Sequence, residues 1–337
     1  MRRSFNTRVV GAVLLGLLSA LFFTSSYVLN RAMAVGGGHW AWSASIRYVV
    51  TLPMLALLIP MQGGFRPVLR AIRAHPLPWL LWSGIGFGLF YACMAYAADS
   101  GPSWLVAGSF QLTVIAGMLL SPFIYRDERR RIPRMALALG TVVFAGVLLM
   151  QFGHFEGALD AAAWIALGCV VVSAFTYPLG NRKLMLHLEG TGESLTATQR
   201  VFGMTLVSQP FWFALAVWGA FEVGLPSGQQ LLLSVAVAFF AGVLATVLFF
   251  HATSQVRDHP TALGAVEAMQ GSEILFASAI GALALGEPWP SGSSTLGALL
   301  VLCGITAFAL LAGRARPLAS AASASGGPME TPRLSEP

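Results

Sequence analysis

Long apolar segments follow one another along this chain, and positive charge is confined to every second gap between them. Of the 20 Lys and Arg residues, all except Arg31 and Arg47 lie in these alternate gaps or in the terminal segments. Segments rich in Lys and Arg resist transfer across a membrane, so loops with this bias remain in the cytoplasm. The pattern predicts a multi-pass membrane protein with both termini in the cytoplasm.

Most of the apolar segments have the ~20 residues that a helix needs to cross the hydrocarbon core of a bilayer. Ten such spans are expected, at about residues 9–29, 40–61, 79–98, 103–125, 135–151, 159–180, 201–221, 230–252, 262–285 and 293–312. Only 10% of the residues are charged and the mean hydropathy is +0.72, whereas soluble domains carry about 25% charged residues. The chain is therefore expected to be an all-α membrane protein, and its basic charge follows from membrane topology and not from binding of nucleic acid.

The two halves of the chain resemble one another at matched positions in the same order. The matched pairs are Asn30-Arg31 with Asn181-Arg182, Arg47 with Arg200, Gln111 with Gln270, and Pro53 with Pro210. Five spans per half is an odd number, so the second half must enter the membrane with the opposite orientation, as in many transporters. We expect two inverted-topology five-helix repeats, residues 1–151 and 152–312, although chance similarity of apolar helices is the alternative. Residues 313–337, rich in Ser, Ala, Gly and Pro, are expected to form a disordered cytoplasmic tail.

Three charged side chains fall well inside predicted spans, namely Arg47, Glu267 and Glu273. An ionisable group inside a membrane costs free energy, so it is a candidate for function. A continuous helix would place Glu267, Gln270 and Glu273 on one polar arc near the bilayer midplane. A carboxyl there can hold a proton until a cation or polar substrate displaces it; permanent pairing with Arg47 or hydrogen bonding between helices is the structural alternative.

Other candidates for a substrate site come from the matched positions. Arg47 can anchor an anionic group, lock a carboxylate, or extend to the membrane surface. Gln111 offers a donor and an acceptor across a cavity, or a hydrogen bond between helices. Trp212 can stack on a flat or cationic substrate or can face lipid. Pro53 and Pro210 interrupt corresponding helices, which points to a transport site, although proline kinks also occur in membrane helices without such a role.

No sequence motif indicates catalysis, a metal site or a cofactor. The chain lacks the His-Glu-x-x-His and Gly-x-Ser-x-Gly patterns, and its three cysteines lie in separate spans without Cys-x-x-Cys spacing. The sequence therefore favours a function other than an enzyme, and no cofactor or metal is expected.

Several stretches are similar to the EamA-like type of the drug/metabolite transporter superfamily and, more narrowly, to its multidrug resistance efflux transporters. These are the paired arginines Arg47 and Arg200, the Leu-Gly-Glu sequence at 285–287, and the stretches 42–48 (WSASIRY), 101–104 (GPSW), 178–183 (PLGNRK) and 265–270 (AVEAMQ). The resemblance implies a secondary transporter of drugs or metabolites in a bacterial-type inner membrane, with a small-molecule substrate, membrane lipids and protons as its partners.

The small four-helix pumps of that superfamily carry their membrane-embedded Glu in the first helix, whereas the first span here has no acidic residue. We therefore expect proton-coupled efflux to depend on Glu267 and Glu273. Uptake or exchange of a metabolite is the alternative among transporters, and a membrane enzyme or sensor is the alternative from another class. The sequence pattern predicts no particular oligomeric state.

Overall fold

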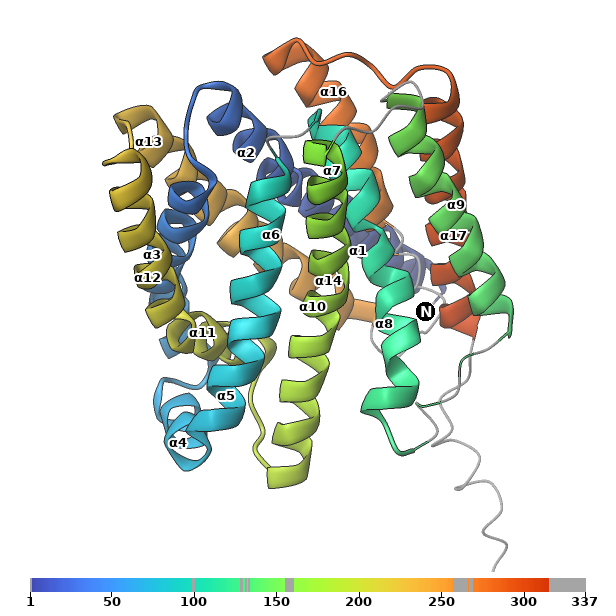
Figure 1. The fold of residues 1–337 in the computed structure, drawn as a ribbon. Coiled ribbons are helices and arrows are strands. Elements are labelled where there is room, and N and C mark those ends of the chain that lie inside the picture. The colour runs from blue at the N-terminus through green and yellow to red at the C-terminus, as the bar shows by residue number, and fades with distance from the viewer. Residues whose placement is uncertain are drawn as a thin grey trace, which may run out of the picture.

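The computed structural model describes residues 2–98, 101–127, 130, 132, 134–154, 161–256, 266 and 269–314 of the chain. Within these residues the fold is a bundle of helices, and no strand is found (Figure 1). The all-α prediction is confirmed. From residue 315 onward the expected tail lies outside the described residues.

The helices occur in the following order. They are α1 (Arg2–Phe23), α2 (Ser25–Val35), α3 (Trp40–Leu58), η1 (Ile59–Gln62), α4 (Arg66–Ala74), α5 (Pro76–Ser83), η2 (Gly84–Leu89), α6 (Phe90–Ala97), α7 (Ser103–Phe110), α8 (Leu112–Ile124), α9 (Arg134–His154), α10 (Ala161–Thr191), α11 (Ala197–Val207), α12 (Gln209–Val223), α13 (Gly228–Val237), η4 (Ala238–Ala245), α14 (Thr246–Val256), η5 (Met269–Ser272), α16 (Glu273–Leu285) and α17 (Ser293–Arg314).

Consecutive helices join into longer apolar rods at the positions of the predicted spans. Seven rods in the described structure are long and apolar enough to cross a membrane, and the pair α11–α12, bent by 44°, makes up to eight. Two shorter apolar helices, Met269–Leu285 and Ser293–Ala307, lie where the ninth and tenth spans are expected. The ten-span arrangement and its division at residues 151 and 152 remain predictions.

Matching rods are interrupted in matching ways. The segments η2 and η4 are π-helical and lie inside the third and eighth rods. Gln111 separates α7 from α8, and its sequence partner Gln270 lies in the 3₁₀ turn η5, directly before α16. Since π-helical and 3₁₀ segments inside helices often mark functional sites or hinges, these interruptions direct attention to the helices around them.

Helices from the two halves of the chain pack against one another and share one core. α9 packs along α17, α1 along α14, α10 along α6 and α8, α3 along α12, and α7 along α16. The contact of α10 with η2 is especially close, because a Cβ added to Gly180 would clash with the backbone of Gly86. Glycines that face each other in this way let two membrane helices approach closely.

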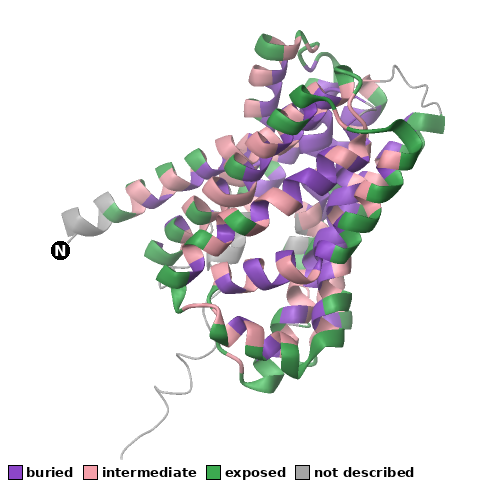
Figure 2. Ribbon diagram, turned by 90° about the vertical axis from the view of Figure 1, so that its left-hand side faces the viewer, coloured by how far each residue is buried: buried purple, intermediate pink, exposed green. Residues whose placement is uncertain are grey.

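The outer surface of the bundle is apolar, as lipid contact requires. Large side chains such as Leu283 (89% exposed), Phe221 (88%) and Phe123 (82%) lie on it. Figure 2 shows that buried residues line the interior of the bundle and that the N-terminal part of α1 projects away from it. Val10 and Leu14 on that part of α1 are largely exposed. Functional polar groups must therefore be sought in the interior.

Candidate functional site

A buried carboxyl and a tyrosine from opposite halves of the chain meet in the interior. Glu273 is the first residue of α16 and is buried, and the hydroxyl of Tyr27 on α2 donates a hydrogen bond of 2.9 Å to its Oε2. The 3₁₀ turn η5 brings the carboxyl to a helix N-terminus, where unpaired N–H groups favour negative charge. The structure thus confirms that Glu273 lies inside the protein and identifies a partner that is neutral.

The predicted polar arc of the ninth span is only partly present. Residues 269–272 form the 3₁₀ turn η5 and not an α-helix, so the rotation between Gln270 and Glu273 differs from the 100° per residue that we assumed. The Gln270 amide lies 3.5 Å from the carbonyl oxygen of Gly16 on α1. Glu267 lies outside the described residues, so its predicted role stays a prediction.

Arg47 on α3 lies buried against aromatic rings. Its guanidinium carbon is 3.7 Å from the centre of the Tyr91 ring and 5.2 Å from that of Tyr48. The Arg47 side chain is only 9% exposed, which excludes extension to the membrane surface. Among the described residues no carboxylate oxygen lies within 4.0 Å of its nitrogens, and its Nη1 has no hydrogen-bond partner. Arg47 is therefore a buried cation that contacts aromatic faces and, within the described residues, no acid.

Asn30 connects this cation to α2. Its Nδ2 donates a hydrogen bond of 2.8 Å to the hydroxyl of Tyr91, the ring that lies against Arg47. Asn30 Oδ1 is buried and has no partner among the described residues. Asn30 and Tyr27 are three residues apart on α2 and therefore share one face of that helix, so α2 contacts the acid directly and is linked to the cation through Tyr91. Tyr27 also lies within electrostatic range of Arg47.

Trp212 on α12 packs against Tyr48, one of the two rings that contact Arg47. Its ring stacks on Tyr48 with 4.3 Å between ring centres and an angle of 11°, and its indole N–H donates to Ser208 Oγ at 3.1 Å. Trp212 is fully buried, so the alternative that it faces lipid is wrong. Tyr48, Tyr91, Tyr27 and Trp212 all belong to the main core. We call Tyr27, Asn30, Arg47, Tyr48, Tyr91, Trp212 and Glu273 the central cluster.

The two prolines behave differently. Pro210 lies in the first turn of α12, just after the bend at Ser208, whereas α3 continues through Pro53 to Leu58. The expectation of interruptions at both prolines is thus wrong for Pro53, because neighbouring helices can accommodate a membrane proline without a break.

Gln111 lies buried at the joint between α7 and α8, and no side-chain hydrogen bond of it is found within the described part of the chain.

A second polar cluster closes the end of the bundle at which α7 begins, and the sequence analysis did not identify it. α16 ends at Gly286, whose φ of +64° suits glycine and turns the chain back toward α7. The Glu287 carboxylate then accepts hydrogen bonds from the N–H (2.9 Å) and hydroxyl (3.0 Å) of Ser103 and lies 3.7 Å from Arg31 Nε. Arg31 also donates to Ala98 O at 3.2 Å. Glu287 thus joins α2, α7 and α16 at this end.

Comparison with known families identifies the family of the chain, which a bundle of helices alone does not identify. The model of the EmrE family, described as "Putative multidrug resistance efflux transporter", matches residues 10–314. The chain belongs to this family. The match confirms the resemblance to the drug/metabolite transporter superfamily, and with the long apolar rods it makes the chain a multi-pass membrane protein.

Two curated relatives cover most of the family match. The protein is 42% identical over 303 residues to "Uncharacterized protein YjlA" of Bacillus subtilis (strain 168), a match that covers 87% of this chain and 93% of the relative. It is 39% identical over 284 residues to "Uncharacterized 42.1 kDa protein in intracellular alkaline protease 3'region" of Shouchella clausii, which covers 82% of this chain and 74% of that relative. Their descriptions add no substrate.

A solved structure shares the fold. It is described as "Crystal structure of protein" and superposes with a TM-score of 0.60, covering 90% of this chain and 98% of its own. Because the sequence identity is only 14%, the likeness concerns the arrangement of helices and not the residues of the central cluster.

Proposed function

We propose that this EmrE-family member is a secondary transporter that exports small organic molecules across the bacterial inner membrane in exchange for protons. The observation that carries the proposal is the buried carboxyl of Glu273, whose hydrogen-bond partner among the described residues is the neutral hydroxyl of Tyr27. The family description supports efflux as the direction and a transporter over a membrane enzyme or sensor.

A buried carboxyl of this kind is suited to exchange. No cation of the described protein neutralises Glu273 at ion-pair distance, so a proton or a cationic group of the substrate has to do so while the site is closed to water. Proton and substrate then compete for the same oxygen atoms. Binding of one releases the other, which couples their movements in opposite directions.

Arg47 contributes the opposite charge to the same interior. Its Nη1, which has no hydrogen-bond partner among the described residues, is a donor that a carboxylate or phosphate of a substrate can use, while the faces of Tyr91 and Tyr48 hold the guanidinium in place. Asn30 Oδ1, on the residue that bonds to Tyr91, is an acceptor that likewise has no partner in the described part of the chain. These groups fit a substrate that carries a polar or anionic group in addition to any cationic one.

The helix interruptions provide the places at which the bundle can change conformation. The joint at Gln111 and the bend between α11 and α12 lie within rods, and the turn η5 begins the shorter apolar helix Met269–Leu285. We propose that movement at these joints opens the central cluster first to the cytoplasm and then to the outside. The charged gaps support an orientation with both termini in the cytoplasm.

Proteoliposomes with a pH-sensitive dye inside test the mechanism. A panel of amino acids, nucleosides and cationic dyes is applied outside, and proton flux is recorded for the native protein and for Glu273→Gln. We expect substrate-driven proton flux in the native protein and its loss in Glu273→Gln. Glu267→Gln, assayed in parallel, tests the other predicted carboxyl.

The matched control is Glu222→Gln, which removes an exposed carboxyl at the end of α12. This variant should transport as the native protein does. Substrate-driven proton flux of native size in Glu273→Gln would reject the exchange mechanism. Turnover of a lipid without movement of any solute would reject the transporter altogether.

A further inference from the structure

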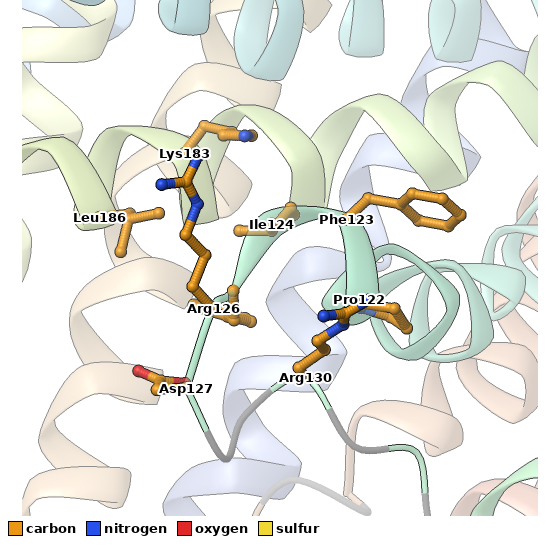
Figure 3. Close-up of a pocket in the computed structure, with 9 residues that line it drawn as sticks. Pro122, Phe123, Ile124, Arg126, Asp127, Arg130, Lys183 and Leu186 are labelled. Carbon is orange, nitrogen blue, oxygen red and sulfur yellow. The ribbon is translucent and has the colours of Figure 1, made fainter.

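A basic pocket lies away from the central cluster, at the end of the bundle where α8 and α10 finish. It has a volume of about 750 Å³ and is lined by Arg126, Arg130 and Lys183 together with apolar residues (Figure 3). Lys183 comes from α10, whereas Arg126 and Arg130 follow α8, so chain segments from the two halves build it together. Figure 1 places the ends of α8 and α10 and the basic helix α4 at the same end of the bundle.

Within the described lining, the cations Arg126, Arg130 and Lys183 outnumber the acid Asp127. Figure 3 shows the guanidinium of Arg126 reaching up toward Lys183, while the acidic residue of the lining, Asp127, lies on the other side of Arg126. Cations that line one pocket repel each other, and an anion bound there relieves this repulsion. A phosphate group can accept hydrogen bonds from Arg126 and Lys183, and Arg and Lys are the residues that bind phosphate in proteins.

The walls of the pocket suit a molecule that is also apolar. Phe123, in the last turn of α8, is 82% exposed, and Leu186 lines the pocket from α10. Lys183 also lies over the ring of Trp82 at 5.8 Å, an aromatic contact typical of the level of lipid headgroups. Acyl chains can follow the surface of α8 while the headgroup occupies the basic end.

The pocket lies beside a hydrogen-bonded contact between α8 and α10, which belong to different halves of the chain. Arg182, the neighbour of Lys183, donates hydrogen bonds from Nη1 to Gly117 O and to Ser121 Oγ (2.9 Å), both on α8. These bonds hold α8 against α10 beside the pocket. A ligand that bridges Arg126 and Lys183 adds a second connection between the same two helices.

We propose that this pocket binds the phosphate headgroup of an anionic phospholipid and that the bound lipid stabilises the contact of α8 with α10. Basic pockets between membrane helices on the cytoplasmic side bind such headgroups. Topology alone explains basic residues on this side of the membrane, but it does not explain their convergence from two distant segments on one pocket with an apolar wall.

The test compares two double variants that remove the same charge from the same end of the bundle. Arg126→Gln with Lys183→Gln removes two of the three pocket cations, and Arg66→Gln with Arg70→Gln removes two exposed cations of α4. Each protein is purified in detergent, and its thermal unfolding is followed with dioleoyl phosphatidylglycerol, dioleoyl phosphatidylcholine or inorganic phosphate. Native mass spectrometry counts the phosphatidylglycerol molecules retained.

Phosphatidylglycerol should raise the unfolding temperature of the native protein and of the α4 variant, whereas phosphatidylcholine and inorganic phosphate should not. The pocket variant should bind phosphatidylglycerol roughly tenfold more weakly or worse, as expected for two lost headgroup contacts. Equal weakening in the α4 variant would overturn the proposal, because surface charge alone would then explain binding. If inorganic phosphate raised the unfolding temperature as much as phosphatidylglycerol does, the ligand would be phosphate and not the lipid.

Discussion

The Tyr27 hydroxyl donates a 2.9 Å hydrogen bond to the carboxylate of Glu273 across 246 residues of sequence. This bond joins α2 of the first half to α16 of the second half and lies in the interior of the bundle. It defines one end of the central cluster, and Arg47 with its aromatic neighbours defines the other.

Tyr27→Phe removes the hydroxyl but keeps the ring that packs in the core. Because a hydrogen bond to a buried ionisable group contributes about 1.5–3 kcal/mol, we expect lower thermal stability and a shifted dependence of transport on pH. Glu273→Gln removes the titrating group, so its transport should no longer depend on pH through this site. Transport rates of the native protein and of both variants are measured across a pH series. If both variants showed the native dependence on pH, Glu273 would not be the group that binds the proton.

Arg47→Gln removes the buried cation, and Arg47→Lys keeps the charge but loses the flat guanidinium that lies on Tyr91. Because cation–π contacts of a desolvated guanidinium contribute about 2 kcal/mol, the unfolding free energy of Arg47→Gln should fall by about that amount. Transport should fall in both variants, because a lysine ammonium cannot stack in the same way. Arg66→Gln, on exposed α4, is the control. Large destabilisation with unchanged transport would show that Arg47 is structural.

Gly180→Ala tests the close approach of α10 to η2. The new methyl group would meet the backbone of Gly86, so the helices must move apart, at a cost of about 1–3 kcal/mol in unfolding free energy. Gly168→Ala on the same helix is the matched control, because a Cβ there meets no atom within 4 Å. Thermal unfolding in detergent compares the two, and equal stability would mean that the α10–η2 contact is looser than described.

Glu287→Gln and Ser103→Ala test the second polar cluster through a double-mutant cycle. The carboxylate accepts hydrogen bonds from the first residue of α7 and complements the positive end of that helix. Each single variant should therefore lose stability, and the double variant should lose less than the sum, with a coupling energy of about 1 kcal/mol. Fully additive losses in unfolding free energy would argue against a direct interaction.

The positions of the membrane helices could be predicted from sequence because apolar length and loop charge are local properties. The predicted spans at 40–61 and 103–125 agree with the rods Trp40–Gln62 and Ser103–Ile124 within a few residues. The burial of Arg47 and Glu273 was also predictable, since no lipid-facing position tolerates them cheaply.

The partners inside the cluster could not be predicted in the same way. Periodicity indicates which face of a helix is buried but not which distant helix covers it, so the bond from Tyr27 to Glu273 and the contact of Arg47 with Tyr91 were missed. The spacing of Tyr27 and Asn30 on one face of α2 was an available signal. The 3₁₀ turn at 269–272, Met-Gln-Gly-Ser, escaped prediction because it lies inside a long apolar segment whose pattern predicts one continuous helix.

In the π-helical segments η2 and η4, each backbone hydrogen bond spans one residue more than in the α-helix on either side. An extra residue of this kind can migrate along a helix by exchanging one backbone hydrogen bond for the next. Each step turns the side chains it passes by about 100° while the ends of the helix stay anchored. The third and eighth rods can therefore present different side chains to their neighbours without unwinding. A uniform α-helix cannot rotate part of its surface in this way.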